Sequence, residues 1–324
     1  MTMRAWLVVL LLSSACGQDP SAGATRPGTR PDPGTSPATA TAPRTGGDVA
    51  DLVFAALGNW GSGGPGQRRV ADTLARLAPT GPLDFVLLLG DGFRPQGVAS
   101  ARDPLWRSRF EEVYDPVALA VPFYPALGPA DLKGDVAAQI EYGKTNRRWT
   151  MQSFAYDFQV RAHGRTFHFF AADTTSLVGP AHVGATRAAQ RLVVHPLEQS
   201  KADWKIVFGH RSFYAEGKER SDGLEAQLFR DRLGAYLERH KVDVYIASDR
   251  EWLELIEAGS ATLHVLSGAG AGADTAGPAR RGPLTRFQHA GGGFVWFRFD
   301  GRRLAIEFRD AGGDLLHTRE LVKP

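Results

Sequence analysis

Short apolar runs recur along the chain, and most of them end in a glycine or a polar residue. Runs of about four to eight such residues predict buried strands. The predicted strands cover residues 53–57, 85–89, 122–127, 154–160, 166–172, 204–208, 242–246, 263–267, 293–300 and 303–309. Stretches with helical periodicity separate several of them, at 68–77, 105–114, 188–199 (interrupted at Pro196) and 223–240. The alternation, with strand-rich stretches in the middle and at the end, predicts a layered α/β sandwich with mixed sheets.

Residues 1–16 have the layout of an export signal. A short basic start is followed by an apolar run at 5–12 and by small residues that lead to Cys16. The run is too short to span a membrane as a helix. The segment resembles a bacterial lipoprotein signal, which implies that Cys16 carries a lipid and becomes the new N-terminus. We expect an exported lipoprotein anchored to a membrane of a bacterial cell envelope, on its periplasmic or outer side. The alternative is an ordinary signal peptide and a secreted protein.

Residues 17–47 consist mainly of Pro, Gly, Ala, Thr and Ser and contain few large apolar groups. Such a segment buries too little surface to offset its chain entropy, so we expect a disordered linker. The globular domain is then residues 48–324. Because Cys16 is the only cysteine, no disulfide can form within the mature chain.

The composition limits the classes of function. The chain has 324 residues, of which 43% are hydrophobic and 10% aromatic, which is enough for a sizeable core. The net charge is only +3, and acidic and basic residues are interspersed without a lysine-arginine block. We therefore expect no nucleic-acid partner and a monomeric protein.

Polar residues follow several of the predicted strands. They are Asn59, Asp91, residues 128–131, His210 and residues 249–251. Ligands in open α/β sheets bind beyond the carboxyl ends of the strands, so we expect these residues to converge at one edge. The glycine-rich stretch 58–66 lacks the Lys-Ser/Thr of a phosphate-binding P-loop and is interpreted as a loop after the first strand.

The chain resembles the calcineurin-like metallophosphoesterases, and most closely the tartrate-resistant purple acid phosphatases. The resemblance covers residues 51–321. Outside the strand ends it includes residues 109–113, 138–142, 148–149, 266–270 and 292–294. It implies a four-layer αββα sandwich with mixed β-sheets. It also implies a site in which two metal ions, bridged by an aspartate, activate a hydroxide and polarise a phosphate ester.

The ligand motifs of that family are mostly altered here. The family pattern is G-D-x-G, G-D-x-x-Y, G-N-H-D/E, a G-H and G-H-x-H. The resemblance implies that Asp91 is the retained bridging ligand and that His210 is also retained. Other residues stand at the remaining positions: Asn59 for the first aspartate, Arg94 for the tyrosine, Pro129 and Ala130 for the asparagine and histidine, and Asp249 and Glu251 for the two last histidines. A dinuclear iron site is therefore not expected, and no catalytic residue is assigned. The resemblance also implies that Asp173, which ends another predicted strand, is a structural residue that caps the next element.

Three interpretations remain open. The first is a catalytically impaired or inactive domain, in which Arg94 pairs with Asp91 or Glu251 as a fixed charge that replaces the ion. The second is an active hydrolase of phosphate esters with an altered site for one divalent metal (Mg²⁺, Mn²⁺, Ca²⁺ or Zn²⁺). Its ligands would be Asp91, His210, Asp249, Glu251 and Asn59. The third is a binding or scaffold lipoprotein that uses its surface.

Overall fold

The computed structural model describes residues 52–178, 193–214, 227, 229–272 and 281–324. The signal and linker predicted for residues 1–47, including Cys16, lie outside the described residues. No helix in the described ranges is long and apolar enough to span a membrane.

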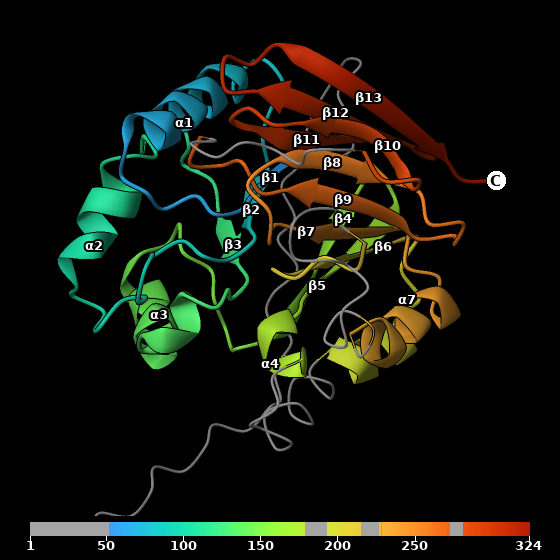
Figure 1. Ribbon diagram of the computed structural model, residues 1–324, viewed down its shortest axis with the longest axis horizontal. Coiled ribbons are helices and arrows are strands. Elements are labelled where there is room, and N and C mark those ends of the chain that lie inside the picture. The colour runs from blue at the N-terminus through green and yellow to red at the C-terminus, as the bar shows by residue number, and fades with distance from the viewer. Residues whose placement is uncertain (1–51, 179–192, 215–226, 228, 273–280) are drawn as a thin grey trace, which may run out of the picture. The chain divides into compact units, whose positions relative to one another are not determined.

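Two mixed sheets form the centre of the domain (Figure 1). The first has six strands in the order β13-β12-β11-β1-β2-β3. Its strands are β1 (Leu52–Leu57), β2 (Phe85–Leu88), β3 (Phe123–Pro125), β11 (Gly293–Asp300), β12 (Arg303–Asp310) and β13 (Leu315–Val322). Strands β1, β2 and β3 are parallel, whereas β11, β12 and β13 pair antiparallel. The register pairs Asp300 with Arg303, so β11 and β12 form a hairpin.

The second sheet has seven strands in the order β10-β8-β9-β7-β6-β5-β4. They are β4 (Tyr156–Ala162), β5 (Arg165–Ala171), β6 (Trp204–Phe208), β7 (Val244–Ala247), β8 (Leu253–Ile256), β9 (Leu263–Ser267) and β10 (Thr285–His289). Strands β5, β6, β7 and β9 are parallel, and β4, β8 and β10 join antiparallel. The carboxyl ends of the central strands of each sheet therefore meet along a single edge.

Helices lie outside the two sheets. They are α1 (Pro65–Leu77), α2 (Pro104–Trp106) continued by a π-helix (Arg107–Glu111), α3 (Val136–Thr145), α4 (Thr174–Val178), a second π-helix (Arg230–Gly234) and α7 (Ala235–Arg239). A 3₁₀ turn covers Asp131–Lys133, and residues 193–199 are also helical. Helices α1, α2 and α3 lie on one side of the sheets in Figure 1, and α4 and α7 lie on the other. The predicted αββα layering is confirmed.

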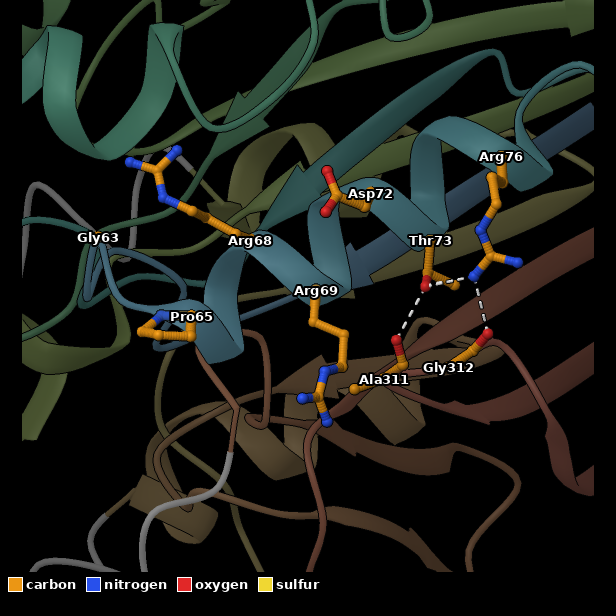
Figure 2. Close-up of a pocket in the computed structure, with 9 residues that line it drawn as sticks. All are labelled: Gly63, Pro65, Arg68, Arg69, Asp72, Thr73, Arg76, Ala311 and Gly312. Atoms are coloured by element: carbon orange, nitrogen blue, oxygen red, sulfur yellow. Dashed lines mark hydrogen bonds between the residues drawn. The ribbon is translucent and has the colours of Figure 1, made fainter.

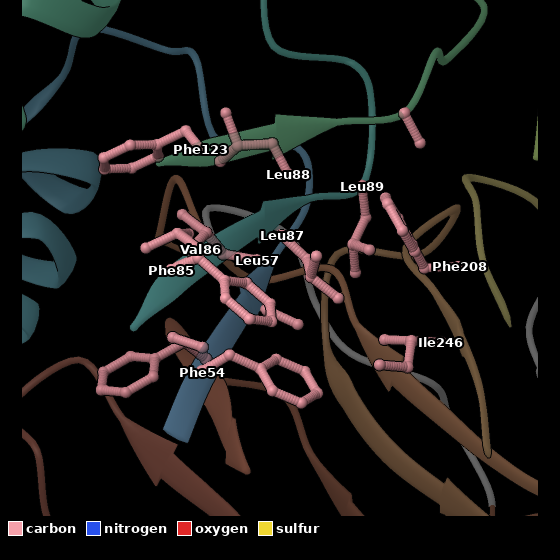
Figure 3. Close-up of a cluster of buried hydrophobic side chains, with 14 of the residues drawn as sticks. Phe54, Leu57, Phe85, Val86, Leu87, Leu88, Leu89, Phe123, Phe208 and Ile246 are labelled. Atoms are coloured by element: carbon pink, nitrogen blue, oxygen red, sulfur yellow. The ribbon is translucent and has the colours of Figure 1, made fainter. Parts of the chain in front are cut away.

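Aromatic side chains fill the space between the sheets. The Phe54 ring of β1 stacks on Phe85 with centroids 5.1 Å apart and meets the edge of Phe169 from β5 at 5.3 Å. Phe208 and Ile246 of the second sheet join the same buried cluster (Figure 3). A second cluster, built around Phe170, Val207 and Tyr245, packs the outer face of the seven-stranded sheet against Leu233 and Leu237. These two cores hold the strand ends in fixed positions.

The predicted strands are confirmed, with ends that differ by one or two residues. The expected helix at 105–114 is present but divides into α2 and a π-helix. The described part of the expected helix at 188–199 continues through Pro196, so the predicted interruption is wrong. A proline removes one hydrogen bond, but Val193 and Leu197 bury the helix face on either side of it. The part at 188–192 and much of 223–228 lie outside the described residues.

Candidate functional site at the strand ends

The polar residues after β1, β2, β6 and β7 come together, as the sequence predicts. The backbone N–H of Asn59 donates to Gly90 O at 3.0 Å, which joins the first two loops. His210 Nδ1 lies 3.1 Å from Leu89 O, and Ser248 Oγ donates to the same carbonyl at 2.5 Å. The loops of both sheets therefore share one hydrogen-bonded edge.

The first two loops turn unusually sharply. Asn59 and Asp91 both adopt a φ of 53°, in the left-handed region. Asparagine and aspartate tolerate this region better than most side chains, and such strain is often found at functional sites. The preceding Gly58 has no room for a side chain, because a Cβ there would lie 2.0 Å from Cβ of Ser248. The backbone thus aims both polar side chains into the same space.

The guanidinium of Arg94 occupies the centre of this space. Its Nε donates to Asp91 Oδ2 at 3.2 Å, and its Nη1 donates to Glu251 Oε1 at 2.5 Å. Its Nη2 donates to Asn59 Oδ1 at 2.6 Å. The predicted pairing of Arg94 with Asp91 or Glu251 is therefore confirmed, and it includes both carboxylates together with a third partner. The arginine side chain is 40% exposed, so this group of hydrogen bonds is partly open to solvent.

The side-chain amide of Asn59 is oriented so that its oxygen faces Arg94. Its Nδ2 donates to the carbonyl oxygens of Ser248 at 2.6 Å, Gly268 at 3.0 Å and Arg250 at 3.3 Å. Its Oδ1 is then the only end left to accept from Arg94. An aspartate at this position would place a carboxylate oxygen against carbonyl oxygens, and neither carries a proton to share. The asparagine is thus required by its surroundings.

Hydrogen bonds fix both the carboxylate and the backbone of Asp91. Besides Arg94, the backbone N–H of Ala130 donates to its Oδ1 at 2.9 Å. Its own N–H donates to Asp131 Oδ2 at 2.8 Å, and Gly128 N–H donates to the same oxygen at 2.9 Å. Burial raises the pKa of Asp131 to about 6, and the nearby charge of Asp91 adds to this, while the hydrogen bond from Gly128 opposes it. Asp131 lies in the predicted strand-end stretch 128–131, and its carboxylate accepts both of these backbone hydrogen bonds, a role that its sequence position alone does not specify.

His210 is buried and directed by its neighbours. Burial lowers its pKa, and the charge of Asp91 opposes that shift only in part. Its Nδ1 faces Leu89 O, so the ring donates there and leaves Nε2 unprotonated. Nε2 lies 3.9 Å from Asp91 Oδ2, which is too long for a hydrogen bond. His210 and Asp91 are therefore adjacent without being bonded to each other.

The remaining predicted positions fall into two groups. Pro129 and Ala130 lie in the loop after β3, where Ala130 contributes only its backbone N–H. Asp249 and Glu251 lie after β7, and Glu251 bonds Arg94. The Oδ1 of Asp249 is buried and has no hydrogen-bond partner within the described part of the chain. Asp173 caps α4, since its Oδ1 accepts from Ser176 N–H at 3.1 Å, which confirms its predicted structural role.

A hollow of about 630 Å³ lies elsewhere, between α1 and the turn that joins β12 to β13 (Figure 2). Its lining includes Arg68, Arg69 and Arg76 but none of the strand-end residues above. Arg76 Nη2 donates to Gly312 O at 2.9 Å, and Thr73 Oγ1 donates to Ala311 O at 2.8 Å. These bonds tie the helix to the turn, so the hollow is explained by packing of α1 on the sheet.

The fold and the strand-end geometry define a class of protein. A family model described as calcineurin-like phosphoesterase matches residues 48–249, and the chain belongs to that family. Purple acid phosphatase 3 from Arabidopsis thaliana is 28% identical over 85% of this chain and 78% of its own. Tartrate-resistant acid phosphatase type 5 from Rattus norvegicus is 28% identical over 85% and 91%.

Solved structures support the fold. GAP50, described as the anchor in the inner membrane complex of Plasmodium, superposes with a TM-score of 0.76 at 23% identity, over 85% of this chain and 90% of its own. Purple acid phosphatase PPD1 from yellow lupin superposes with a TM-score of 0.61 at 16% identity, over 84% and 53%. At these identities the likenesses concern the fold alone.

The family is metal-dependent, so the fit of a metal to these residues can be tested. The described residues contain no group of three or more His, Cys, Asp or Glu side chains arranged to hold an ion. Asn59 points its nitrogen inward to carbonyls, and Arg94 places a cation among Asp91, Asn59 and Glu251. A second cation there would meet electrostatic repulsion at short range. The described donor set does not fit the dinuclear centre of the family.

Proposed function

We propose that this protein is a member of the calcineurin-like phosphoesterase family whose strand-end site does not hydrolyse phosphate esters. In this proposal Arg94 takes the structural place of the metal ions. The observation that carries it is the set of three hydrogen bonds from one guanidinium to Asp91, Glu251 and Asn59. All three side chains stand at positions where the family binds metal.

The chemistry of the arginine supports this role. A guanidinium can neutralise the carboxylates and hold the strand ends together, which a metal would otherwise do. It does not lower the pKa of a bound water toward neutrality, which is how a metal centre produces its nucleophile. It also cannot donate or accept a proton near neutral pH, because arginine stays charged. The site therefore keeps the architecture of a phosphatase without its source of hydroxide.

The test measures metal content and turnover on the full chain. The protein is loaded with Mn²⁺, Zn²⁺ or iron, its metal content is measured by mass spectrometry, and hydrolysis of an aryl phosphate is followed. We expect substoichiometric metal, no visible absorption band after iron loading, and a rate equal to that of D91N. The matched control is D72N, which removes an exposed aspartate from α1. Stoichiometric metal with turnover that D91N abolishes and D72N preserves would instead support an altered mononuclear hydrolase.

We also propose that the domain is displayed as a lipoprotein. The support is the single cysteine at position 16, the export-type segment before it and the linker composition of residues 17–47. A tethered domain whose strand-end site does not hydrolyse phosphate esters would use that site for recognition at a membrane surface. The test is fractionation: the native chain should sediment with membranes, and C16S should be released. A native chain found only in the soluble fraction would rule out the anchor.

A further inference from the structure

Three polar side chains form a continuous relay on the outer face of the seven-stranded sheet. His168 of β5 is buried and only 3% exposed. Its Nε2 lies 2.8 Å from Asp157 Oδ2 on β4, and its Nδ1 lies 2.8 Å from Ser200 Oγ. A hydroxyl, an imidazole and a carboxylate are thus joined in order by two short hydrogen bonds.

The surroundings fix the tautomer of the ring. Asp157 as a carboxylate can only accept, so Nε2 must carry the proton. Nδ1 then presents its lone pair to Ser200 Oγ, and the Gln159 amide also approaches Nδ1, at 3.5 Å. In this tautomer the imidazole can accept the hydroxyl proton of Ser200. The order of roles is that of a nucleophile, a base and a group that orients the base.

Neighbouring contacts hold the relay in place. The His168 ring lies 4.0 Å from the Phe170 ring, and β4 pairs Gln159 with His168 across the sheet. The loop that follows Ser200 is fastened because Asp203 Oδ2 accepts from Thr166 N–H at 2.8 Å. Ser200 follows the 193–199 helix and is partly exposed. The base is thus buried, and the nucleophile belongs to a residue that solvent reaches in part.

We propose that Ser200 is an activated nucleophile toward small carboxylic esters, with His168 as its base and Asp157 as the residue that positions His168. Ser200 Oγ forms a bond to the ester carbonyl carbon while its proton moves to His168 Nδ1. The bond from that carbon to the alcohol oxygen then breaks, and the His168 proton passes to the leaving alkoxide. Water hydrolyses the acyl-serine by the same proton route. The relay shares no residue with the strand-end site, so it does not depend on the role proposed for Arg94.

The experiment uses the full chain and two probes, p-nitrophenyl acetate and an alkyl fluorophosphonate. Hydrolysis of the first is followed by absorbance, and the residue labelled by the second is identified by mass spectrometry. We expect one covalent adduct on Ser200, no adduct in S200A, and labelling in D157N slower by about 10²-fold or more. Ser200 and Asp157 are both partly exposed, so circular dichroism and a thermal melt should show that both variants fold.

The matched control is S108A, which removes an exposed serine whose hydroxyl donates to a backbone carbonyl. Labelling of Ser200 in S108A should equal that of the native chain. The proposal is overturned if Ser200 carries no adduct, or if folded D157N is labelled as fast as the native chain. It is also overturned if Ser108 and Ser200 are labelled at equal rates. The relay would then be a structural bridge between β4, β5 and the following loop.

Discussion

Replacing Arg94 by alanine tests whether this side chain holds the strand ends together. The change removes three hydrogen bonds and leaves Asp91 and Glu251 without their shared cation. A hydrogen bond to a charged group contributes about 1.5–3 kcal/mol when it is buried. Because the arginine is 40% exposed and Glu251 is 32% exposed, about 1 kcal/mol for each bond is more appropriate. We therefore expect R94A to lose about 3 kcal/mol of unfolding free energy.

The assay is urea unfolding followed by fluorescence and circular dichroism. A loss of about 3 kcal/mol corresponds to a lower melting temperature by about 6 °C for a domain of this size. R94K keeps the positive charge but lacks the planar guanidinium and its several N–H donors, so it should recover only part of the lost unfolding free energy. A double-mutant cycle with E251Q should give a coupling energy above about 0.5 kcal/mol. A change below about 0.5 kcal/mol in R94A would refute the structural role of the arginine.

The same variant tests the connection with metal binding. Without the guanidinium, Asp91 and Glu251 lack their shared cation, and divalent ions favour such oxygen ligands. Added Mn²⁺ should raise the melting temperature of R94A, because a ligand that binds only the folded state stabilises it. The native protein should show no such shift. An equal shift in both proteins would contradict the idea that Arg94 excludes the metal.

Three further predictions concern other residues. N59D should lose about 1–3 kcal/mol in urea unfolding, because its carboxylate would face three carbonyl oxygens, and equal stability would contradict this account. Burial lowers the pKa of His264 from 6.5 to about 3. Between these two pH values the unfolded chain binds more protons than the folded chain, so the free energy of unfolding should fall as the pH is lowered from 6.5 to 3. H264F should remove this pH dependence, which amounts to about 1.4 kcal/mol of unfolding free energy per pH unit. Urea unfolding at several pH values measures it, and an unchanged pH dependence in H264F would exclude His264 as its source. G61A should destabilise strongly, since its Cβ would lie 1.2 Å from Gly92 O, whereas G81A meets only ordinary contacts and should melt close to the native temperature.

The central strands and the convergence of the site could be predicted because they depend on simple patterns. Strands buried on both faces are continuous apolar runs, and the parallel order brings their ends together. Two of the four edge strands, β10 and β13, were missed for the opposite reason. Strand β13 has the sequence LLHTRELV and is partly exposed along its whole length, so it has no apolar run. Strand β10 is half-exposed in the same way.

Strand β8 and helix α3 were also missed, for two different reasons. Strand β8 contains Glu254, a residue that disfavours a buried strand from sequence alone. In the fold, Trp252 Nε1 donates to its Oε2 at 2.9 Å and Thr285 Oγ1 donates to its Oε1 at 2.5 Å, which satisfy the buried carboxylate. Helix α3 begins where Asp135 accepts from Ala138 N–H at 3.2 Å. That cap could have been read from the sequence, whereas the partners of Glu254 could not.

A comparison of motifs alone does not show that the altered residues of the candidate site depend on one another. Position by position, Asn59 and Arg94 are two separate losses of metal ligands. In the structure they depend on each other, because Asn59 offers Arg94 an oxygen only while its nitrogen is held by the carbonyls of the opposite loop. Restoring an aspartate at 59 would disturb that loop, and removing the arginine would leave repelling carboxylates. In the structure the altered residues thus form one hydrogen-bonded unit that joins the strand ends through the Arg94 guanidinium.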